Sequence, residues 1–189
     1  DVKKGMYTLE QKQRFKPDPD QSMTQVTLFL KTSFDHHRYN IWTTAWLNEF
    51  IELQATSFFY ILEVDRESMQ TVFHSLKDAG IAANVFLKPD ERVIENYLSE
   101  LKEAVVIQPM ISRAPVMQVR SVVVPTLEKI LVDLFCEEKL LFAYQGRQLV
   151  RIYEACFQKY LVNFSRLLSY ARRREREDGI KNFLSAQPR

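Results

Sequence analysis

Apolar residues follow two different spacings along the chain, and the change between them predicts where strands and helices lie. Short, nearly continuous apolar runs of strand length occupy residues 39–42, 57–64, 83–87 and 104–108. The run at 57–64 is rich in aromatic residues and predicts a central strand that is covered on both faces. The segment 115–125 predicts a hairpin that turns at Arg120-Ser121, where no Gly fixes the turn type.

Helices are expected between these runs, where apolar residues recur at i, i+3, i+4 and i+7. The first is expected at 23–34, and Thr44 is expected to cap a second through about Leu53. Asp65 is expected to cap a third helix that Gly80 ends, and Pro89-Asp90-Glu91 to open a fourth. The apolar faces expected for these last two helices are Met69, Val72, Phe73 and Leu76, and Val93, Ile94, Tyr97, Leu98 and Leu101.

The chain is expected to be helical from about residue 126 onward. One apolar stripe runs from Leu127 to Phe135 and another from Leu149 to Leu161. Ser165 is expected to cap a third helix, which Gly179 ends. Strands that alternate with helices predict an α/β fold: a mainly parallel mixed sheet flanked by helices, with a C-terminal helical segment.

Length and composition predict one well-filled core. The chain has 189 residues, of which 46% are hydrophobic, enough for a single domain with a small appendage. The stretch "KPDPDQS" carries two Pro and three charged residues, which indicates a linker. We therefore expect a short opening piece at 1–16 and one α/β domain at 17–189.

Charge and cysteine content change the picture only a little. The net charge is +2, so no overall field commits the chain to nucleic acid or to a membrane. The two Cys lie within helical patterns, and we interpret them as reduced, buried thiols of a cytoplasmic protein. No apolar run approaches the roughly 20 residues that span a bilayer, so we expect no membrane partner.

Common catalytic and cofactor motifs do not occur in this sequence. Four Gly cannot build a glycine-rich phosphate loop, which excludes nucleotide binding of the P-loop or Rossmann kind. Asp35, His36 and His37 resemble a metal trio, but adjacent loop ligands rarely converge on one ion, so a solvated turn is favoured. No Ser or Cys lies in a nucleophile elbow. We expect no metal, no cofactor and no catalytic residue.

An enzyme alternative depends on three residues. Metal-dependent nucleases of the restriction-enzyme type place an acid at one strand end and an acid-x-Lys on the next strand, where the carboxylates hold a divalent ion. Glu63 and Asp65 end one expected strand, and Lys88 follows the next. Phe86 stands where the second acid belongs, so a nuclease, or an inactive relic of one, is the less favoured hypothesis.

The segment "YARRREREDG" holds the densest run of charge. The run contains four Arg and three acids, so its net charge is +1. The Arg are Arg172, Arg173, Arg174 and Arg176, and the acids are Glu175, Glu177 and Asp178. Interspersed charge is typical of a solvated helix end, where Arg also complements the helix dipole. The alternative is a contact with phosphate or with an acidic partner, because three consecutive Arg precede the acids. Both interpretations stay open.

The stretch "PTLEKILVDLF" is the most distinctive of the chain. Pro125 stops a strand, Thr126 is suited to cap a helix, and Glu128 lies in the first turn, where the helix dipole favours an acid. The amphipathic pattern predicts that Leu131 is buried, whereas Lys129 and Asp133 lie on the polar side. By this pattern, Lys129→Ala costs little stability.

This stretch, with "WLNEF" (46–50) and "YARRR" (170–174), resembles the AbiEi-like antitoxins of type IV toxin–antitoxin (abortive infection) systems, and looks closest to a bacterial branch of that group. The family motif maps onto Pro125, Thr126, Glu128, Lys129 and Asp133. The resemblance covers roughly residues 39–184. It implies a regulator with a C-terminal domain of this kind and a nucleotidyltransferase-like toxin as partner.

The opening segment "VKKGMYTL" resembles the end of the winged helix-turn-helix that this family carries at its N-terminus. Lys3 and Lys4 match the basic residues of the wing, and Gly5 permits its tight turn. Lys side chains there reach phosphates. The resemblance therefore implies that residues 1–16 are the remnant of a wing and that DNA is read by a helix upstream of residue 1.

The leading hypothesis is a regulatory and protein-interaction domain of an antitoxin-like transcriptional regulator, without enzymatic activity. Candidate DNA contacts are Lys3, Lys4, Arg172, Arg173, Arg174 and Arg176. The alternatives are the nuclease or nuclease relic and a structural dimerisation module, for which the helices at 127–135 and 149–161 supply an interface. A homodimer is thus a further expectation.

Overall fold

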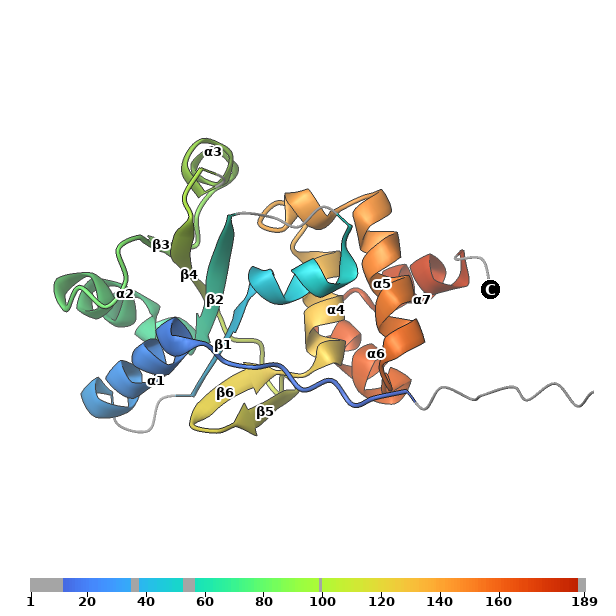
Figure 1. The fold of residues 1–189 in the computed structure, drawn as a ribbon, viewed down its shortest axis with the longest axis horizontal. Coiled ribbons are helices and arrows are strands. Elements are labelled where there is room, and N and C mark those ends of the chain that lie inside the picture. The colour runs from blue at the N-terminus through green and yellow to red at the C-terminus, as the bar shows by residue number, and fades with distance from the viewer. Residues whose placement is uncertain (1–11, 35–37, 53–56, 99, 187–189) are drawn as a thin grey trace, which may run out of the picture.

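A computed structural model describes residues 12–34, 38–52, 57–98 and 100–186. A four-stranded mixed sheet lies between two layers (Figure 1), and its strand order is β1-β2-β4-β3. The strands are β1 (Tyr39–Thr43), β2 (Phe58–Val64), β3 (Val85–Leu87) and β4 (Glu103–Pro109). β2 and β3 both run parallel to β4, and β1 is antiparallel to β2. The expected α/β class and the central place of β2 are confirmed.

One face of the sheet is covered by two helices and a hairpin. The helices are α1 (Gln21–Ser33) and α2 (Met69–Asp78), and the hairpin consists of β5 (Val116–Val119) and β6 (Val122–Pro125). The residues that point to this face include Ile41, Leu62 and Ile107, which join one apolar cluster. Arg120 takes a positive φ of 54° at the hairpin turn, which supplies the backbone geometry that the absent Gly would give.

The other face is covered by the C-terminal helices. They are α4 (Leu127–Cys136), α5 (Arg147–Lys159), α6 (Phe164–Arg173) and α7 (Glu177–Ser185), and Figure 1 shows them gathered on one side of the sheet. Five short helical elements complete the fold of the described residues: η1 (Thr44–Phe50), η2 (Arg66–Ser68), α3 (Glu91–Val93) running into η3 (Ile94–Leu98), and η4 (Phe142–Tyr144).

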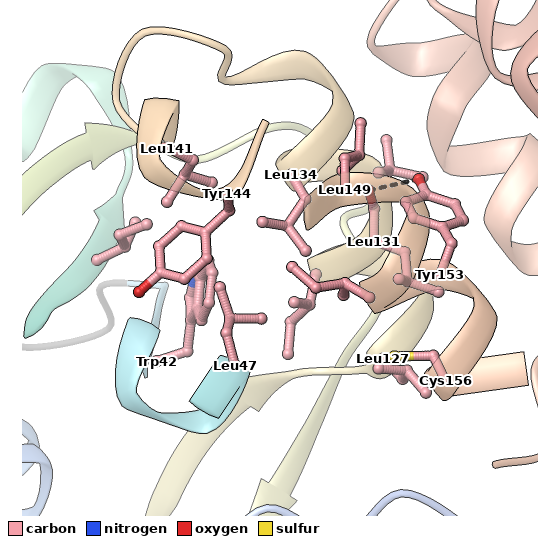
Figure 2. Packing of buried hydrophobic residues seen from close by; sticks show 14 of the residues in the cluster. Trp42, Leu47, Leu127, Leu131, Leu134, Leu141, Tyr144, Leu149, Tyr153 and Cys156 are labelled. Atoms are coloured by element: carbon pink, nitrogen blue, oxygen red, sulfur yellow. Dashed lines mark hydrogen bonds between the residues drawn. The ribbon is translucent and has the colours of Figure 1, made fainter. Parts of the chain in front are cut away.

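α4 is the central helix of this layer. Every residue from Leu127 to Leu134 is buried, so the helix has no solvent-facing side over two turns. Figure 2 shows Leu131 and Leu134 of α4 between Trp42 on one side and Tyr153 of α5 on the other. The Tyr153 hydroxyl donates a hydrogen bond of 2.7 Å to the Leu131 carbonyl, so its polar end is satisfied inside the core.

Several helix boundaries differ from those expected. Thr43, not Thr44, caps η1, because its hydroxyl accepts from the Ala45 N–H. Asn163, not Ser165, caps α6, because its side chain accepts from the Arg166 N–H at 3.0 Å. η1 is also a 3₁₀ helix that ends at Phe50, before the expected Leu53.

Three further expectations about helices are wrong. Asp65 makes no side-chain capping bond and pairs with Arg38 at 3.1 Å instead. Gly179 lies inside α7, and Glu175, with a φ of +56°, makes the turn after α6. A Cβ at Gly179 would lie 3.3 Å from the Phe135 ring, so close helix packing explains this Gly. Tyr97, which was expected to be buried, is 63% exposed and lies in the π turn η3.

The stretch interpreted as a linker lies against the domain. Pro17 and Pro19 are buried, and the Gln13 N–H donates to the Lys159 carbonyl at 3.0 Å. The Phe15 ring meets the Tyr160 ring edge-on, with centroids 5.4 Å apart. Residues 12–20 therefore form a strap that joins the end of α5 to the start of α1. Lys3, Lys4, His36 and His37 lie outside the described residues.

Candidate functional site

A row of three polar residues crosses the sheet on the face that the C-terminal helices cover. Asn40 of β1 pairs in register with Glu63 of β2, and Glu63 pairs with Gln108 of β4. Because side chains alternate along a strand, all three point to the same side as Trp42 and Ile61. The row lies near the carboxyl ends of the parallel strands β2 and β4, the edge where open α/β sheets commonly bind ligands.

Lys129 of α4 meets this row from above. Its Nζ donates to Glu63 Oε1 at 2.7 Å and also to Asp133 Oδ2, one helical turn further along α4. The Asn40 amide donates to the other Glu63 oxygen at 2.9 Å. The Lys129 side chain is 0% exposed, and the Glu63 and Asp133 side chains are 5% and 4% exposed. A buried cation is thus held by two buried carboxylates.

The second oxygen of Asp133 is bound from α6 and the turn after it. The Tyr170 hydroxyl donates to Asp133 Oδ1 at 2.9 Å, and Arg174 Nη1 donates to the same oxygen at 3.0 Å. Arg174 Nη2 donates to Glu137, at the end of α4. The Lys129 ammonium lies 5.5 Å from the centre of the Tyr170 ring, a cation–π distance. These contacts join β2, α4 and α6 through charge.

Burial and pairing set the protonation states of this network. Burial lowers the pKa of Lys129, but the carboxylates of Asp133 and Glu63 more than offset that effect and hold it above its ordinary value. Burial raises the pKa of Glu63, and the Lys129 ammonium opposes the rise. Lys129 therefore stays an ammonium at neutral pH, and it is no candidate for a neutral amine nucleophile.

A cavity of about 220 Å³ adjoins the network. The sheet contributes Glu63 and Gln108 to its lining, α4 and its C-cap contribute Asp133 and Glu137, and the end of α6 with the turn after it contributes Arg173, Arg174 and Glu175. Trp42, Ile61, Pro109, Ile111 and Leu140 supply the apolar part of the wall. The network is thus reached from solvent through a small cavity, of whose lining residues half are charged.

A second hollow, of about 500 Å³, lies between the strap, the hairpin and the linker from α5 to α6. Phe15, Met117 and Leu161 give it apolar walls, and Arg14 and Arg166 give it positive charge. Leu161 is 57% exposed. Because this hollow is open and apolar with a basic rim, it has the character of a docking groove for another molecule.

The whole chain, residues 1–189, matches the family described as "Family of unknown function (DUF6577)". The chain belongs to this family. No curated protein and no solved structure matches it. The resemblance to AbiEi-like antitoxins stays a prediction, since these matches do not test it. Within the described residues, no helix of this family member is long and apolar enough to cross a membrane.

The five motif residues of this DUF6577 chain are all buried, and three of them differ from expectation. Lys129 and Asp133 were expected on a polar side that α4 does not have, because helices pack around it. Thr126 occupies the N-cap position, but its hydroxyl makes no capping bond. Glu128 accepts the Asn163 N–H at 2.9 Å and so positions the start of α6. Pro125 ends β6, as expected.

Sequence reasoning missed the network because it treated each charge separately. The usable signal was a Lys and an Asp four residues apart, within a helix whose other positions are almost all apolar. Residues four apart lie on the same face of a helix, so these two charges leave the rest of the helix surface apolar. A helix that is apolar all round is buried. Glu63 carried a second signal, since it ends a strand that was expected to be covered on both faces.

The four Arg of the run lie in four different environments. Arg174 is 14% exposed and belongs to the buried network. Arg172 is 72% exposed and pairs with Glu177 of α7, which holds the two helices together. Arg173 is exposed at the mouth of the cavity, with Ser112 at 3.4 Å. Arg176 is exposed at the start of α7.

The residues of the nuclease hypothesis do not come together. β4 lies between β2 and β3, so Asp65 and Lys88 follow strands that are not neighbours. Asp65 pairs with Arg38, and the Lys88 N–H extends the ladder to the Ile107 carbonyl at 3.0 Å. Glu63 is bound to Lys129 and Asn40 rather than facing Asp65.

Proposed function

We propose that this chain is a regulatory, protein-interaction domain of an antitoxin-like transcriptional regulator, and that it acts in the cytoplasm without catalysing a reaction. The partner is a nucleotidyltransferase-like toxin, and DNA is bound by a winged helix of which Lys3 and Lys4 are part. The family resemblance suggests the biological role, and the surface of the domain suggests how a partner is held.

The motif that carries the resemblance supports this proposal through its role in the fold. Lys129, Asp133 and Glu128 are engaged in bonds that join α4 to β2 and α6. Charged groups that neutralise one another in this way make the domain rigid. Their hydrogen-bonding atoms are already engaged with protein partners, whereas an acid–base or nucleophilic group must reach a substrate. Residues that define a shared fold are what a family of interaction domains would have in common.

The groove beside the strap is the observation that carries the proposal. Its walls are Phe15, Met117 and Leu161, and its rim holds Arg14 and Arg166. An apolar anchor surrounded by polar residues is the usual anatomy of a protein interface. Arg166 lies 3.6 Å from Glu128, and the two Arg together favour a partner segment with an apolar side chain flanked by acids.

The test uses a nucleotidyltransferase-like protein of the kind that the resemblance implies as toxin, co-expressed and then titrated against the purified domain. We expect the wild-type domain to bind the toxin and to restore the growth of cells that express the toxin. We expect Leu161→Asp to bind the toxin at least tenfold more weakly. Leu28→Asp is the matched control, because Leu28 is 62% exposed on α1 and does not line the groove.

Equal binding by both variants, or no association at all, would contradict the proposal. Oligomeric state is measured in the same experiment by light scattering. A dimer that Leu161→Asp dissociates would assign the groove to a second copy of this chain instead of to a toxin.

A further inference from the structure

The network around Lys129 contains one carboxylate more than its cations can neutralise. It holds three carboxylates and two cations, so its net charge is −1. The carboxylates are those of Glu63, Asp133 and Glu137, and the cations are Lys129 and Arg174. An unneutralised charge is costly away from water, so a buried carboxylate in such a network gains by taking up a proton.

Glu63 is the least compensated of the three carboxylates. Asp133 accepts three hydrogen bonds, from an ammonium, a phenol and a guanidinium group. The Glu137 side chain is 35% exposed, so water shares its charge. Glu63 is only 5% exposed, and it shares the ammonium of Lys129 with Asp133. Burial raises the pKa of Glu63, Lys129 opposes this effect, and the negative charge of Asp133 adds to it.

The titratable groups that face Glu63 come from the helical layer. Those of the described residues are Lys129, Asp133, Glu137, Tyr170, Arg173, Arg174 and Glu175. Burial raises the pKa of Tyr170, so this phenol stays neutral. Arg173 and Glu175 lie at the mouth of the cavity with opposite charges, and they leave the net charge unchanged. The neighbouring strands contribute the uncharged amides of Asn40 and Gln108.

Both oxygens of Glu63 already accept a hydrogen bond, so a proton cannot bind without displacing a donor. Oε1 accepts from Lys129 Nζ at 2.7 Å, and Oε2 accepts from the Asn40 amide at 2.9 Å. The bond from Asn40 is the weaker one, because its donor is uncharged. Oδ1 of Asn40 is buried and has no hydrogen-bond partner among the described residues. Rotation of this amide therefore breaks only its bond to Glu63, and it brings Oδ1 to the former position of the amide nitrogen.

We propose that Glu63 and Asn40 form a pH-sensitive switch between β1 and β2. Glu63 takes up a proton from the cavity that it lines, and its O–H then donates to Oδ1 of the rotated Asn40 amide. The hydrogen bond between the two strands thus reverses its direction. Lys129 keeps Asp133 and faces a neutral Glu63, so the network becomes neutral and the contact of β2 with α4 loses its ion pair.

Solution NMR of the full chain follows both members of the switch. The carboxyl ¹³C signal of Glu63 and the side-chain NH₂ signals of Asn40 are recorded from about pH 8 to about pH 4, because an ordinary Glu has a pKa of about 4.3. We expect Glu63 to titrate above that value and the Asn40 signals to change with the same midpoint. The Gln118 amide is the control, since it donates to the Arg120 carbonyl and its signals should not share this midpoint.

Glu63→Gln tests the direction of the bond, because its neutral amide has the shape of the protonated acid and can donate to Asn40 Oδ1. We expect the Asn40 signals of this variant to resemble those of the wild type at low pH and to stay constant as the pH changes.

Stability gives a second measurement with a defined sign. The folded pKa of Glu63 is above the unfolded value, so the bound proton stabilises the wild type fully below the unfolded value, and this stabilisation is lost as the pH rises through the folded pKa. Urea unfolding should therefore show Glu63→Gln gaining stability relative to the wild type over that rise. Glu138→Gln, at an exposed acid outside the cavity lining, is the control and should show no such gain.

A Glu63 midpoint at or below that of an ordinary Glu would overturn the proposal. Asn40 signals that stay constant through the Glu63 midpoint would also overturn it, because the amide would then not rotate. Both observations are made on the wild type, so they decide the proposal even where Glu63→Gln does not fold.

Discussion

The ammonium nitrogen of Lys129 lies 2.7 Å from Oε1 of Glu63, and both side chains are buried between a helix and a sheet. The two residues are 66 positions apart in the chain, so this bond fixes α4 to β2 across the whole molecule. The same ammonium holds Asp133, which in turn accepts bonds from Tyr170 and Arg174. The network fixes the position of α4 and α6 on the sheet, and the cavity lies between these elements.

Lys129→Ala is therefore expected to lower the free energy of unfolding by roughly 3–5 kcal/mol, because it leaves the buried Glu63 carboxylate without its cation and Asp133 with Arg174 alone. Lys139→Ala is the matched control, since Lys139 is 72% exposed and pairs with Glu91 at 3.1 Å. An exposed pair of this kind contributes about 0–1 kcal/mol. Urea unfolding of both variants measures the difference, and similar small losses would contradict the burial of Lys129.

A double replacement separates the charge from the space it fills. Glu63→Leu combined with Lys129→Met removes both charges and leaves Asp133 with Tyr170 and Arg174. We expect this variant to be more stable than Lys129→Ala, because replacing a buried pair with apolar side chains is often close to neutral. A double variant that is less stable than Lys129→Ala would show that the pair itself, and not its desolvation, dominates.

Leu131→Ala is expected to cost about 2–5 kcal/mol, because Leu131 is 0% exposed at the centre of the helical core. Leu28→Ala provides the comparison, since a 62% exposed Leu leaves no cavity and its loss should stay within about 0.5 kcal/mol. Thermal unfolding of the two variants gives the ranking. A small effect at Leu131 would mean that the core can collapse around the missing atoms.

The sequence was enough to predict most strands and the α/β class, because a strand covered on both faces leaves a continuous apolar run. β2 and β4 were found in this way, and the hairpin was found by its two β-branched arms. Helix starts were less predictable, because neighbouring residues compete for the cap. Thr43 and Thr44 both have the chemistry of a cap, and only the local backbone selects Thr43.

The polar network was not predictable by the same reasoning. A pattern along one helix distinguishes a polar position from an apolar one, but it does not tell whether a distant strand offers the opposite charge. Lys129 finds Glu63 only once β2 and α4 are packed together. The cavity was hidden for the same reason, since its lining comes from the sheet, α4 and the turn after α6.

Glu177 contributes stability that depends on pH and is lost in acid. Hydrogen bonds from Arg172 and Lys181 hold the pKa of Glu177 down, at about 2. The folded pKa is below the unfolded value of about 4.3, so the stabilisation is complete above that value and is lost as the pH falls toward 2. We expect Glu177→Gln to be less stable than wild type at pH 6 and to approach it near pH 2.

Urea unfolding at pH 6, 4 and 2 follows this convergence. Glu67→Gln serves as the control, because Glu67 is an exposed acid of η2. A constant gap between Glu177→Gln and wild type over this range would show that the ion pair from α6 to α7 does not carry the acid dependence.

The last prediction concerns the Arg run. Variants of Arg172, Arg173 and Arg174 should differ in their effects on stability and on DNA binding. Arg174→Ala leaves Asp133 and Glu137 short of a partner, so we expect a loss of roughly 2–4 kcal/mol, toward the lower end for a side chain that is partly exposed. Arg172→Ala should cost little stability, because an exposed pair is screened by solvent, and Arg173→Ala less still.

Nucleic-acid binding follows a different order. Only exposed Arg can neutralise a phosphate, and each one that does so adds about one unit to the slope of log affinity against log salt. With a DNA-binding form of the protein on its operator, Arg174→Ala should leave this slope unchanged at a temperature where the variant is folded. Arg172→Ala and Arg173→Ala together should flatten it by up to about two units if this surface touches DNA. Because Glu177 already neutralises Arg172, and Glu175 lies next to Arg173, we expect no change in slope. A loss of two units would place a second DNA contact on this domain.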